Sequence, residues 1–218
     1  MTVVDKSMDL GYSSKKTEIF LNWLGTNKIV LDLGCYDGRD SKKFIGQGNT
    51  VHGIEVLQKP AKKAEKLGIK VKNIDIEKQS WEYKPNTFDV VICGDIIEHV
   101  IDVDTFLTNI KDVLKSGGEV YISTPNLASI GRRLLLLLGK NPFIEVSNID
   151  KVNGFPAVGH VRYFTKTSLT RLLNHHGFEV VKVTSDNINL GGFSSAKLAE
   201  MFPTFSWRLI VKAIKSDV

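Results

Sequence analysis

Four side chains with acid–base or metal-binding chemistry stand out in the sequence: Asp95, Glu98, His99 and, further along, His160. Carboxylates and imidazoles can hold Mg²⁺ or Mn²⁺, and a bound metal acidifies a hydroxyl that it contacts. Without a metal, a neutral imidazole titrates near physiological pH and suits a base or an orienting group. A structural role, with Glu98-His99 capping a helix and His160 packed in a loop, is the third alternative. The residues favour the metal-free role, with His99 and His160 as the catalytic pair, and leave the metal unknown.

A glycine-rich turn is the second chemical feature, and it lies in the stretch from Lys28 to Lys42, KIVLDLGCYDGRDSK. The apolar run at 29–33 predicts a strand buried on both faces. Gly34 and Gly38 then flank a tight turn that leads into a polar, helical segment. Glycine has no Cβ and a helix start offers unpaired N–H groups, so this geometry lets the backbone approach a small ligand.

The charge at this turn indicates the kind of ligand. A dinucleotide site requires G-x-G-x-x-G, a spacing that Gly34-x-x-x-Gly38 lacks. Asp32 stands two residues before the first glycine, where its carboxylate would face an anionic phosphate unfavourably. A ligand with a positive charge at that point suits the turn better.

The motif Asp32-x-Gly34-Cys35-x-x-Gly38 resembles the S-adenosyl-L-methionine (SAM) motif of Rossmann-like methyltransferases. In that family the turn passes against the methionine part of the cofactor, whose ammonium and sulfonium groups are positive. The resemblance implies that these residues bind SAM. The family usually has glycine where this chain has Tyr36, so Tyr36 must avoid a positive φ or adopt one at a cost.

Further cofactor contacts are expected where the next strands end. Glu55 ends the second predicted strand, and an acidic residue there commonly accepts hydrogen bonds from ribose hydroxyls in both NAD and SAM folds. The resemblance implies that Asp75 reaches the adenine amino group and that Ile76 packs on the ring. Gly94 and Asp95 follow the fourth strand, at the sheet edge where ligands gather.

Strands and helices alternate along the chain, which indicates an α/β fold. The resemblance implies a Rossmann-like doubly wound sheet, mostly parallel, with an antiparallel last strand inserted between its neighbours. The sequence predicts strands at 29–33, 50–55, 70–74, 88–93, 119–124, 178–183 and 205–213, and helices at 15–24, 40 to about 47, 60–68, 104–114, 127–138 and 167–175.

Two further resemblances concern the acceptor side. Ubiquinone-pathway O-methyltransferases and small-RNA 2′-O-methyltransferases carry a similar Glu-x-x-Glu-His with a later histidine; here Asp95, one methylene shorter, stands first. The segment 159–165, followed by a helix, resembles methyltransferases found beside glycosyltransferases and in quinone pathways. Within it, Arg162 contacts an anionic acceptor or pairs at the surface, and the sequence leaves both open.

One methyltransferase domain is expected over 1–218, with a lid or substrate-side insertion at 127–158, where the regular pattern loosens. Within it, the leucine run 134–138 follows Arg132 and Arg133. We expect a buried helix or a dimer contact there, while contact with a membrane surface is the less favoured alternative.

Composition narrows the class of protein and its partners. The chain has 218 residues, two cysteines and a net charge of +5, with lysines spread along it. Such a diffuse excess gives no clustered basic face, so no nucleic acid is expected as a partner. The cysteines indicate no disulfide framework and, with no signal pattern or membrane-length apolar run, predict a cytoplasmic protein. A homodimer and a peripheral membrane contact stay open.

The sequence therefore predicts a SAM-dependent methyltransferase that acts on a hydroxyl of a small-molecule, sugar or lipid-linked acceptor and releases S-adenosyl-L-homocysteine. A divalent metal is an alternative that is not favoured. The rival functions are an NAD-dependent oxidoreductase, which the missing glycine spacing argues against, and a non-catalytic SAM-binding or protein-interaction module. An RNA methyltransferase is disfavoured because no basic or aromatic-rich face is evident.

Overall fold

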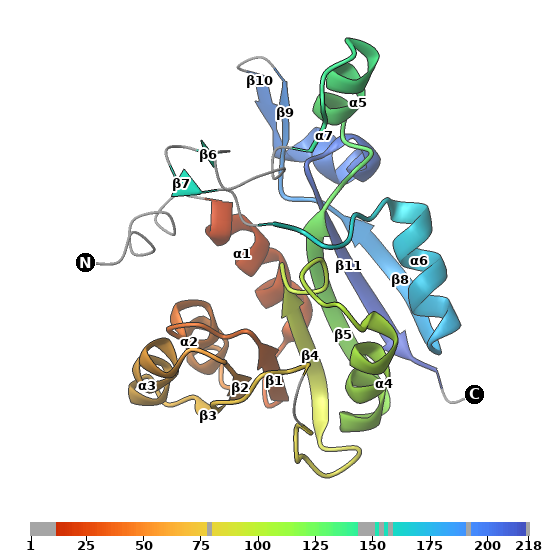
Figure 1. Ribbon diagram of the computed structural model, residues 1–218. Coiled ribbons are helices and arrows are strands. Elements are labelled where there is room, and N and C mark those ends of the chain that lie inside the picture. The colour runs from red at the N-terminus through yellow and green to blue at the C-terminus, as the bar shows by residue number, and fades with distance from the viewer. Residues whose placement is uncertain are drawn as a thin grey trace.

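A seven-stranded mixed sheet forms the centre of the protein (Figure 1). The computed structural model describes residues 12–77, 80–143, 151–152, 155–156, 159–190 and 193–216. The strand order is β3-β2-β1-β4-β5-β11-β8. The strands are β1 (Ile29–Leu33), β2 (Thr50–Ile54), β3 (Lys70–Lys72), β4 (Phe88–Gly94), β5 (Leu114–Pro125), β8 (Phe178–Thr184) and β11 (Arg208–Lys215). This arrangement confirms the predicted doubly wound α/β class.

The strand order indicates where a ligand would bind, at the carboxyl ends of the parallel strands. Strands β1 to β5 pair in parallel, and the chain order reverses between β1 and β4. In open α/β sheets, ligands bind outside the carboxyl ends of the strands at such a reversal. Strand β11 runs antiparallel to both β5 and β8, as expected. The first residue of β11, Arg208, pairs with Pro125 at the end of β5 and therefore lies at the carboxyl edge.

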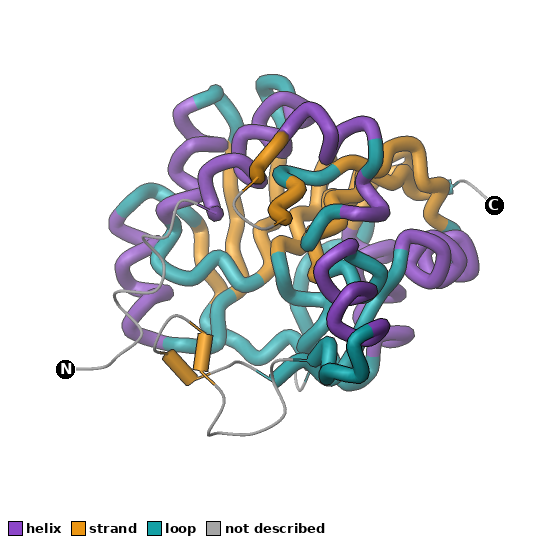
Figure 2. The backbone as a smooth tube through the Cα atoms, turned by 90° about the horizontal axis from the view of Figure 1, so that it is seen from above, coloured by secondary structure: helices purple, strands orange, loops and turns teal. Residues whose placement is uncertain are grey.

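Helices cover both faces of the sheet (Figure 2). They are α1 (Tyr12–Leu24), α2 (Arg39–Gly46), α3 (Gln58–Lys66), α4 (Val103–Val113), α5 (Ile130–Leu137), α6 (Lys166–His175), α7 (Ala196–Met201) and a 3₁₀ turn, η3 (Pro203–Phe205). One apolar core contains Phe20, Phe44 and Ala64 from α1, α2 and α3. The other contains Phe106 from α4 and Leu169 from α6. Helices α1, α2, α3, α4 and α6 therefore each bury an apolar face against the sheet.

Element boundaries differ from the predictions where a local signal was misleading. Strand β5 begins at Leu114 and not at 119, because the stretch through Gly117 and Gly118 continues the strand with a shift in its register against β4. Strand β11 begins three residues after 205, because Pro203 starts the 3₁₀ turn, where a missing N–H is tolerated. Two short pairs complete the described structure, β6 (Lys151–Val152) with β7 (Phe155–Pro156) and β9 (Ile188–Leu190) with β10 (Phe193–Ser195).

The leucine run is exposed and not buried. Helix α5 confirms the helix expected at 127–138, but Leu136, Leu137 and Leu138 are 66%, 81% and 68% exposed. The expectation of a buried helix was therefore wrong, because α5 projects beyond the end of β5 and no described element covers these side chains. The dimer contact stays a prediction. None of the described helices has the length and apolar character needed to cross a bilayer.

Within the expected insertion 127–158, the structure describes α5, the pair β6–β7 and the residues that lead to Phe143. Residues 144–150, 153–154 and 157–158 lie outside the described residues. That this segment is a lid, and that the whole chain is one domain, stay predictions.

Candidate active site

The glycine turn after β1 is anchored to the end of β2. The N–H groups of Gly34 and Cys35 both donate to the Ile54 carbonyl, at 2.8 and 3.2 Å. Tyr36 adopts the left-handed conformation, with φ of 47°, and its N–H donates to Glu55 Oε2 at 3.0 Å. The positive φ that glycine would adopt freely is thus accepted at Tyr36 and stabilised by a hydrogen bond to a buried carboxylate.

Neighbouring elements leave no room for side chains at the two glycines. Gly34 has φ of 68°, and a Cβ there would lie 2.4 Å from Ile96 Cδ1. Gly38 has φ of 78°, and its Cβ would lie 2.9 Å from the backbone Cα of Ala64 in α3. Both positions therefore favour glycine for backbone conformation, and Gly38 also for packing, because it faces backbone whereas Gly34 faces the end of the Ile96 side chain.

Asp32 is a buried carboxyl group at the end of β1. Ser41 Oγ in α2 donates to Asp32 Oδ2 at 2.5 Å. Burial raises the pKa of Asp32 to about 7, although the bond from Ser41 acts in the opposite direction. The neighbouring Cys35 is also buried, and burial raises the pKa of its thiol. Cys35 Sγ would lie 2.5 Å from a Cβ at Gly53, so this thiol packs against β2.

The expected nucleoside contacts follow β2 and β3. Glu55 Oε1 accepts from the N–H of Leu57 at 2.7 Å, in addition to the bond from Tyr36. Asp75 is half-buried and its Oδ1 accepts from the N–H of Glu77 at 3.0 Å. Ile76 is half-buried against the core. The structure therefore brings these predicted residues to the same sheet edge as Asp32 and the glycine turn.

Asp95 lies beyond β4 in an ion-pair network. Its Oδ2 is 2.9 Å from Lys16 Nζ of α1, and its Oδ1 accepts from Ser123 Oγ at 2.9 Å and from Arg208 Nε at 3.2 Å. Burial acts to raise the pKa of Asp95, but the charges of Lys16 and Arg208 outweigh it and hold the pKa well below its usual range. At Gly94, a Cβ would lie 3.1 Å from the same Lys16 Nζ.

A second cluster joins Glu98, His99 and His160. One ligand atom from each lies within 4.8 Å of the others, and the two imidazole centroids are 4.8 Å apart. The N–H groups of Val161 and Arg162 donate to the Glu98 carbonyl at 3.0 and 3.1 Å. These backbone bonds hold the loop with His160 against the turn after β4, and bring together residues that are far apart in the sequence.

Glu98 is the buried member of this cluster. Its Oε2 accepts from Thr124 Oγ1 at 3.1 Å, whereas its buried Oε1 has no hydrogen-bond partner among the described residues. Burial, followed by the charge of Asp95, raises the pKa of Glu98 to about 8. His99 Nδ1 lies 3.3 Å from the Gly159 carbonyl oxygen. In the metal-site alternative, Asp95 would be a ligand together with these groups. In the structure, the Asp95 carboxylate instead pairs with Lys16 and Arg208.

Arg162 has a structural task. Its Nε donates to the Val100 carbonyl at 3.0 Å and its Nη2 donates to the Ile101 carbonyl. The sequence left open an acceptor contact or a surface pairing. In the structure, the side chain bonds to backbone carbonyls and so connects its loop to the turn after Glu98. This geometry does not support contact with an anionic acceptor.

The residues that the sequence did not reveal are Lys16, Thr124, Asp186 and Arg208. Arg208 Nη1 donates to Asp186 Oδ2 at 2.5 Å and links this carboxylate to the Asp95 network. No local pattern marks these residues, because each is an ordinary polar residue of a helix, strand or loop. Their proximity follows from the sheet order alone.

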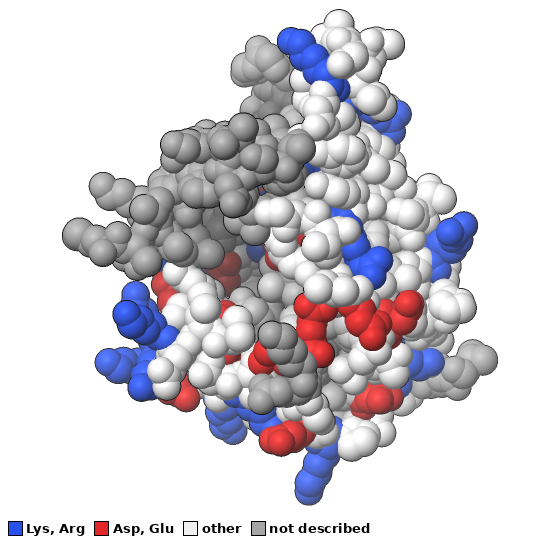
Figure 3. All heavy atoms as spheres, viewed as in Figure 1, with Lys and Arg blue, Asp and Glu red and all other residues white. Residues whose placement is uncertain are grey.

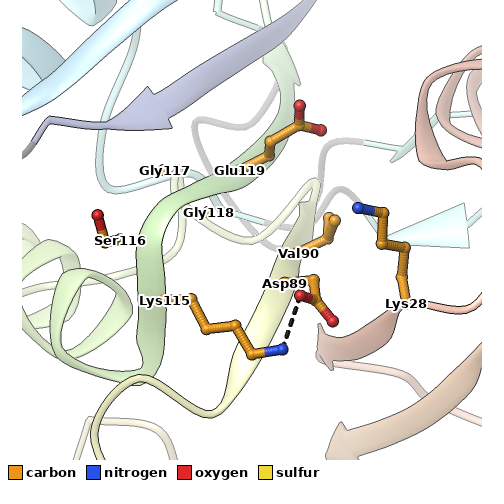
Figure 4. A pocket seen from close by; sticks show the side chains of 8 residues that line it. All are labelled: Lys28, Asp89, Val90, Lys115, Ser116, Gly117, Gly118 and Glu119. Carbon is orange, nitrogen blue, oxygen red and sulfur yellow. Dashed lines mark hydrogen bonds and ion pairs between the residues drawn. The ribbon is translucent and has the colours of Figure 1, made fainter.

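A cavity of about 230 Å³ lies at the opposite sheet edge (Figure 4). It is lined by Lys28, Asp89, Val90 and residues 115–119. Lys115 Nζ is 2.7 Å from Asp89 Oδ1, and Glu119 pairs with Lys212 at 2.8 Å. Its carboxylates are thus paired, and it lies at the wrong ends of the parallel strands for the predicted site.

Sequence comparison identifies relatives over most of the chain. A family model for a methyltransferase domain matches residues 6–183. The ubiquinone biosynthesis O-methyltransferase of Thiobacillus denitrificans is 35% identical over 181 residues, which are 78% of this chain and 74% of that protein. The protein of the same name from Pseudomonas entomophila is 32% identical over 133 residues, or 53% of this chain and 57% of that protein.

Two solved structures that carry methyltransferase names share the fold of this chain. A possible histamine N-methyltransferase from Thermotoga maritima has a TM-score of 0.68 at 20% identity, covering 94% of this chain and 89% of that one. The 1,6-didemethyltoxoflavin-N1-methyltransferase of Burkholderia thailandensis, solved with S-adenosylhomocysteine, has a TM-score of 0.65 at 19% identity, covering 98% and 82%. Such low identities show the fold alone. The family model and the Thiobacillus relative carry the assignment: the chain belongs to the methyltransferase-domain family and is a Rossmann-like, SAM-dependent methyltransferase.

Proposed function

We propose that this methyltransferase transfers the methyl group of SAM to a hydroxyl oxygen of a small-molecule, sugar or lipid-linked acceptor. The observation that carries the proposal is the cluster of Glu98, His99 and His160 at the carboxyl edge of the sheet. A hydroxyl is a weak nucleophile and gains from a base, whereas a stronger nucleophile needs only alignment with the methyl and sulfur. The name of the Thiobacillus relative supports oxygen as the methylated atom.

In this proposal the residues around the glycine turn hold the cofactor. Asp32 and the backbone of Gly34, Cys35 and Gly38 face the methionine part, and Gly94 lets it pass the end of β4. Glu55 accepts from the ribose, while Asp75 and Ile76 receive the adenine. The low pKa of Asp95 keeps a negative charge beside Lys16, so Asp95 acts by holding α1 against the cofactor edge.

The chemical step then needs one proton acceptor. As the acceptor oxygen bonds to the methyl carbon, the carbon–sulfur bond breaks and its electron pair stays on sulfur, which gives S-adenosylhomocysteine. His99 or His160 takes the hydroxyl proton. Glu98 lies beside them, with a carboxylate oxygen within 4.8 Å of a nitrogen of each imidazole, and burial raises its pKa to about 8.

The same three side chains fit a divalent cation. Glu98 Oε1 is buried with no hydrogen-bond partner among the described residues, and two imidazole nitrogens lie within reach of it. Mixed carboxylate and imidazole ligands suit Mn²⁺ or Mg²⁺ with water completing the shell. When bound, such an ion would lower the pKa of the acceptor hydroxyl. His99, His160 and Glu98 would hold it.

The test compares His99→Ala and His160→Ala with the unchanged protein. Calorimetry should show SAM and S-adenosylhomocysteine binding with Kd unchanged in both variants, because neither residue lies at the glycine turn. With phenolic, sugar and lipid-linked hydroxyl acceptors, kcat should fall by roughly 10²- to 10⁴-fold. A matched control is His175→Ala, an ordinary histidine at the end of α6. No SAM binding at high micromolar concentration would contradict the proposal, as would full activity of both variants.

A second readout separates the metal from the metal-free mechanism. If the cluster holds an ion, MnCl₂ should raise the melting temperature of the unchanged protein, and Glu98→Gln should remove that rise. Without an ion, MnCl₂ and a chelator should leave both melting temperature and activity unchanged. The melting readout is independent of turnover.

A further inference from the structure

The exposed apolar surface at the α5 end of the molecule has no task in the chemistry described above. We define it as the leucine surface, formed by exposed side chains of α5 and its C-cap together with those of α7 and η3. Its members are Leu134, Leu136, Leu137, Leu138, Leu198, Met201, Phe202 and Phe205. Single exposed apolar residues are ordinary, but a contiguous group of this kind marks a contact surface.

Two contacts link parts of this surface. The guanidinium of Arg133 lies 5.2 Å from the ring centroid of Phe205, which joins α5 to η3. The rings of Phe202 and Phe205 are 6.3 Å apart. At its base, Gly131 leaves no room for a Cβ, which would lie 2.5 Å from Trp207 Cζ2. Helix α5 is therefore firmly seated on Trp207 while its leucines face outward.

The charged residues on and around α5 are all positive. Residues 126–143 contain Arg132, Arg133 and Lys140 and have no Asp or Glu. Arg133 and Lys140 are exposed, and on α7 Lys197 is exposed beside Glu200. Figure 3 shows basic and uncharged side chains at this end of the face drawn, whereas acidic ones gather lower on the molecule. Exposed leucines with flanking cations match a bilayer surface that contains anionic lipids.

The position in the fold links this surface to the proposed active site. Helix α5 follows the carboxyl end of β5, and η3 immediately precedes Arg208 at the start of β11. The end of β5 and the start of β11 lie at the same sheet edge as the glycine turn and the Glu98 cluster. A protein docked through the leucine surface would therefore hold that edge near the bilayer, where an amphiphilic acceptor resides.

We propose that the leucine surface docks this protein on the surface of membranes that contain anionic lipids, with the leucines of α5 entering the interfacial layer. The alternative occupant is a second copy of the chain. A twofold contact would place Arg133 and Lys140 of each copy beside those of the other, and like charges would oppose it. The membrane surface is favoured because it offers the opposite charge.

The test is sedimentation of the protein with vesicles of phosphatidylcholine, with and without phosphatidylglycerol. We expect clear binding to the mixed vesicles and weak binding to phosphatidylcholine alone. The triple variant Leu136→Ser, Leu137→Ser, Leu138→Ser should bind the mixed vesicles roughly a hundredfold less well. The double variant Arg133→Gln, Lys140→Gln should lose roughly tenfold or more, and high salt should have the same effect.

Matched controls use exposed residues elsewhere. Val181→Ser on β8 and the pair Lys62→Gln, Lys63→Gln on α3 remove similar groups and should leave vesicle binding unchanged. Equal vesicle binding by the triple variant, or no preference for anionic vesicles, would overturn the proposal. So would a dimer, seen by light scattering, that the triple variant abolishes. Calorimetry with SAM on the same variants reports on the cofactor site separately, so the two proposals fail independently.

Discussion

At the scale of single residues, Asp32 is a buried carboxyl group beside the glycine turn that we propose binds the cofactor. Its pKa rises from 3.8 to about 7, chiefly through burial. The folded state therefore binds a proton at pH values where the unfolded chain has already lost it. Linkage then requires that stability falls as pH rises through this window. A cationic ligand at the turn would favour the ionised form and so release this proton.

We predict that Asp32→Asn removes this part of the pH dependence. Without cofactor, the free energy of unfolding of the unchanged protein should decline between about pH 4 and pH 7, and the variant should decline less, because it loses the contribution of Asp32 and keeps that of Glu98. The difference should be on the order of 2 kcal/mol or more at pH 8. Urea denaturation at a series of pH values measures it. Asp37→Asn, at an exposed ion pair with Arg39, is the control; identical curves for all three proteins would refute the prediction.

At the scale of elements, the glycine turn depends on how closely α2 and α3 approach each other. Gly38 is the N-cap of α2 with φ of 78°, and a Cβ there would lie 2.9 Å from the backbone Cα of Ala64 in α3. Gly48 has a similar φ of 89°, but no atom lies within 4 Å of the position of its Cβ. The two glycines share a left-handed backbone conformation, which would strain a residue with a side chain, and they differ in packing.

We predict that Gly38→Ala costs more than Gly48→Ala. A left-handed alanine costs about 1–2 kcal/mol at either position. At Gly38 the displacement of α3 should add on the order of 2 kcal/mol. Denaturant unfolding of the two variants measures the difference, and SAM affinity should fall only in Gly38→Ala. Equal losses of stability would mean that α3 shifts without cost and that the close approach has no role.

At the scale of the whole molecule, one arginine connects the last strand to the active-site edge. Arg208 at the start of β11 bonds to Asp95 after β4 and to Asp186 after β8, and Lys16 of α1 meets the same Asp95. Four distant parts of the chain therefore depend on one network. Only an antiparallel last strand places the beginning of β11 at that edge.

We predict that Arg208→Met destabilises the protein by about 3–5 kcal/mol, because Asp95 and Asp186 would lose a shared cation in a largely buried setting. Lys212→Met on the same strand, which loses one pair with Glu119, should cost about 1 kcal/mol or less. Adding Asp186→Asn to Arg208→Met should recover part of the loss. Urea unfolding of the four proteins provides this comparison, and a cost for Arg208→Met no larger than for Lys212→Met would disprove the network.

The sequence alone determined the alternating elements, the glycine turn with Asp32, and the SAM-dependent activity, because these signals are carried by residues close together in the chain. It also selected His99 and His160 by residue type. The tertiary structure decided which distant groups meet: the sheet order brings His160 to His99 and turns Asp95 toward Lys16 and Arg208. It also decided that the leucines of α5 are exposed and that Arg162 bonds to backbone carbonyls. Local spacing encodes helices and strands, whereas burial and long-range pairing depend on strands and loops that the sequence separates by tens of residues.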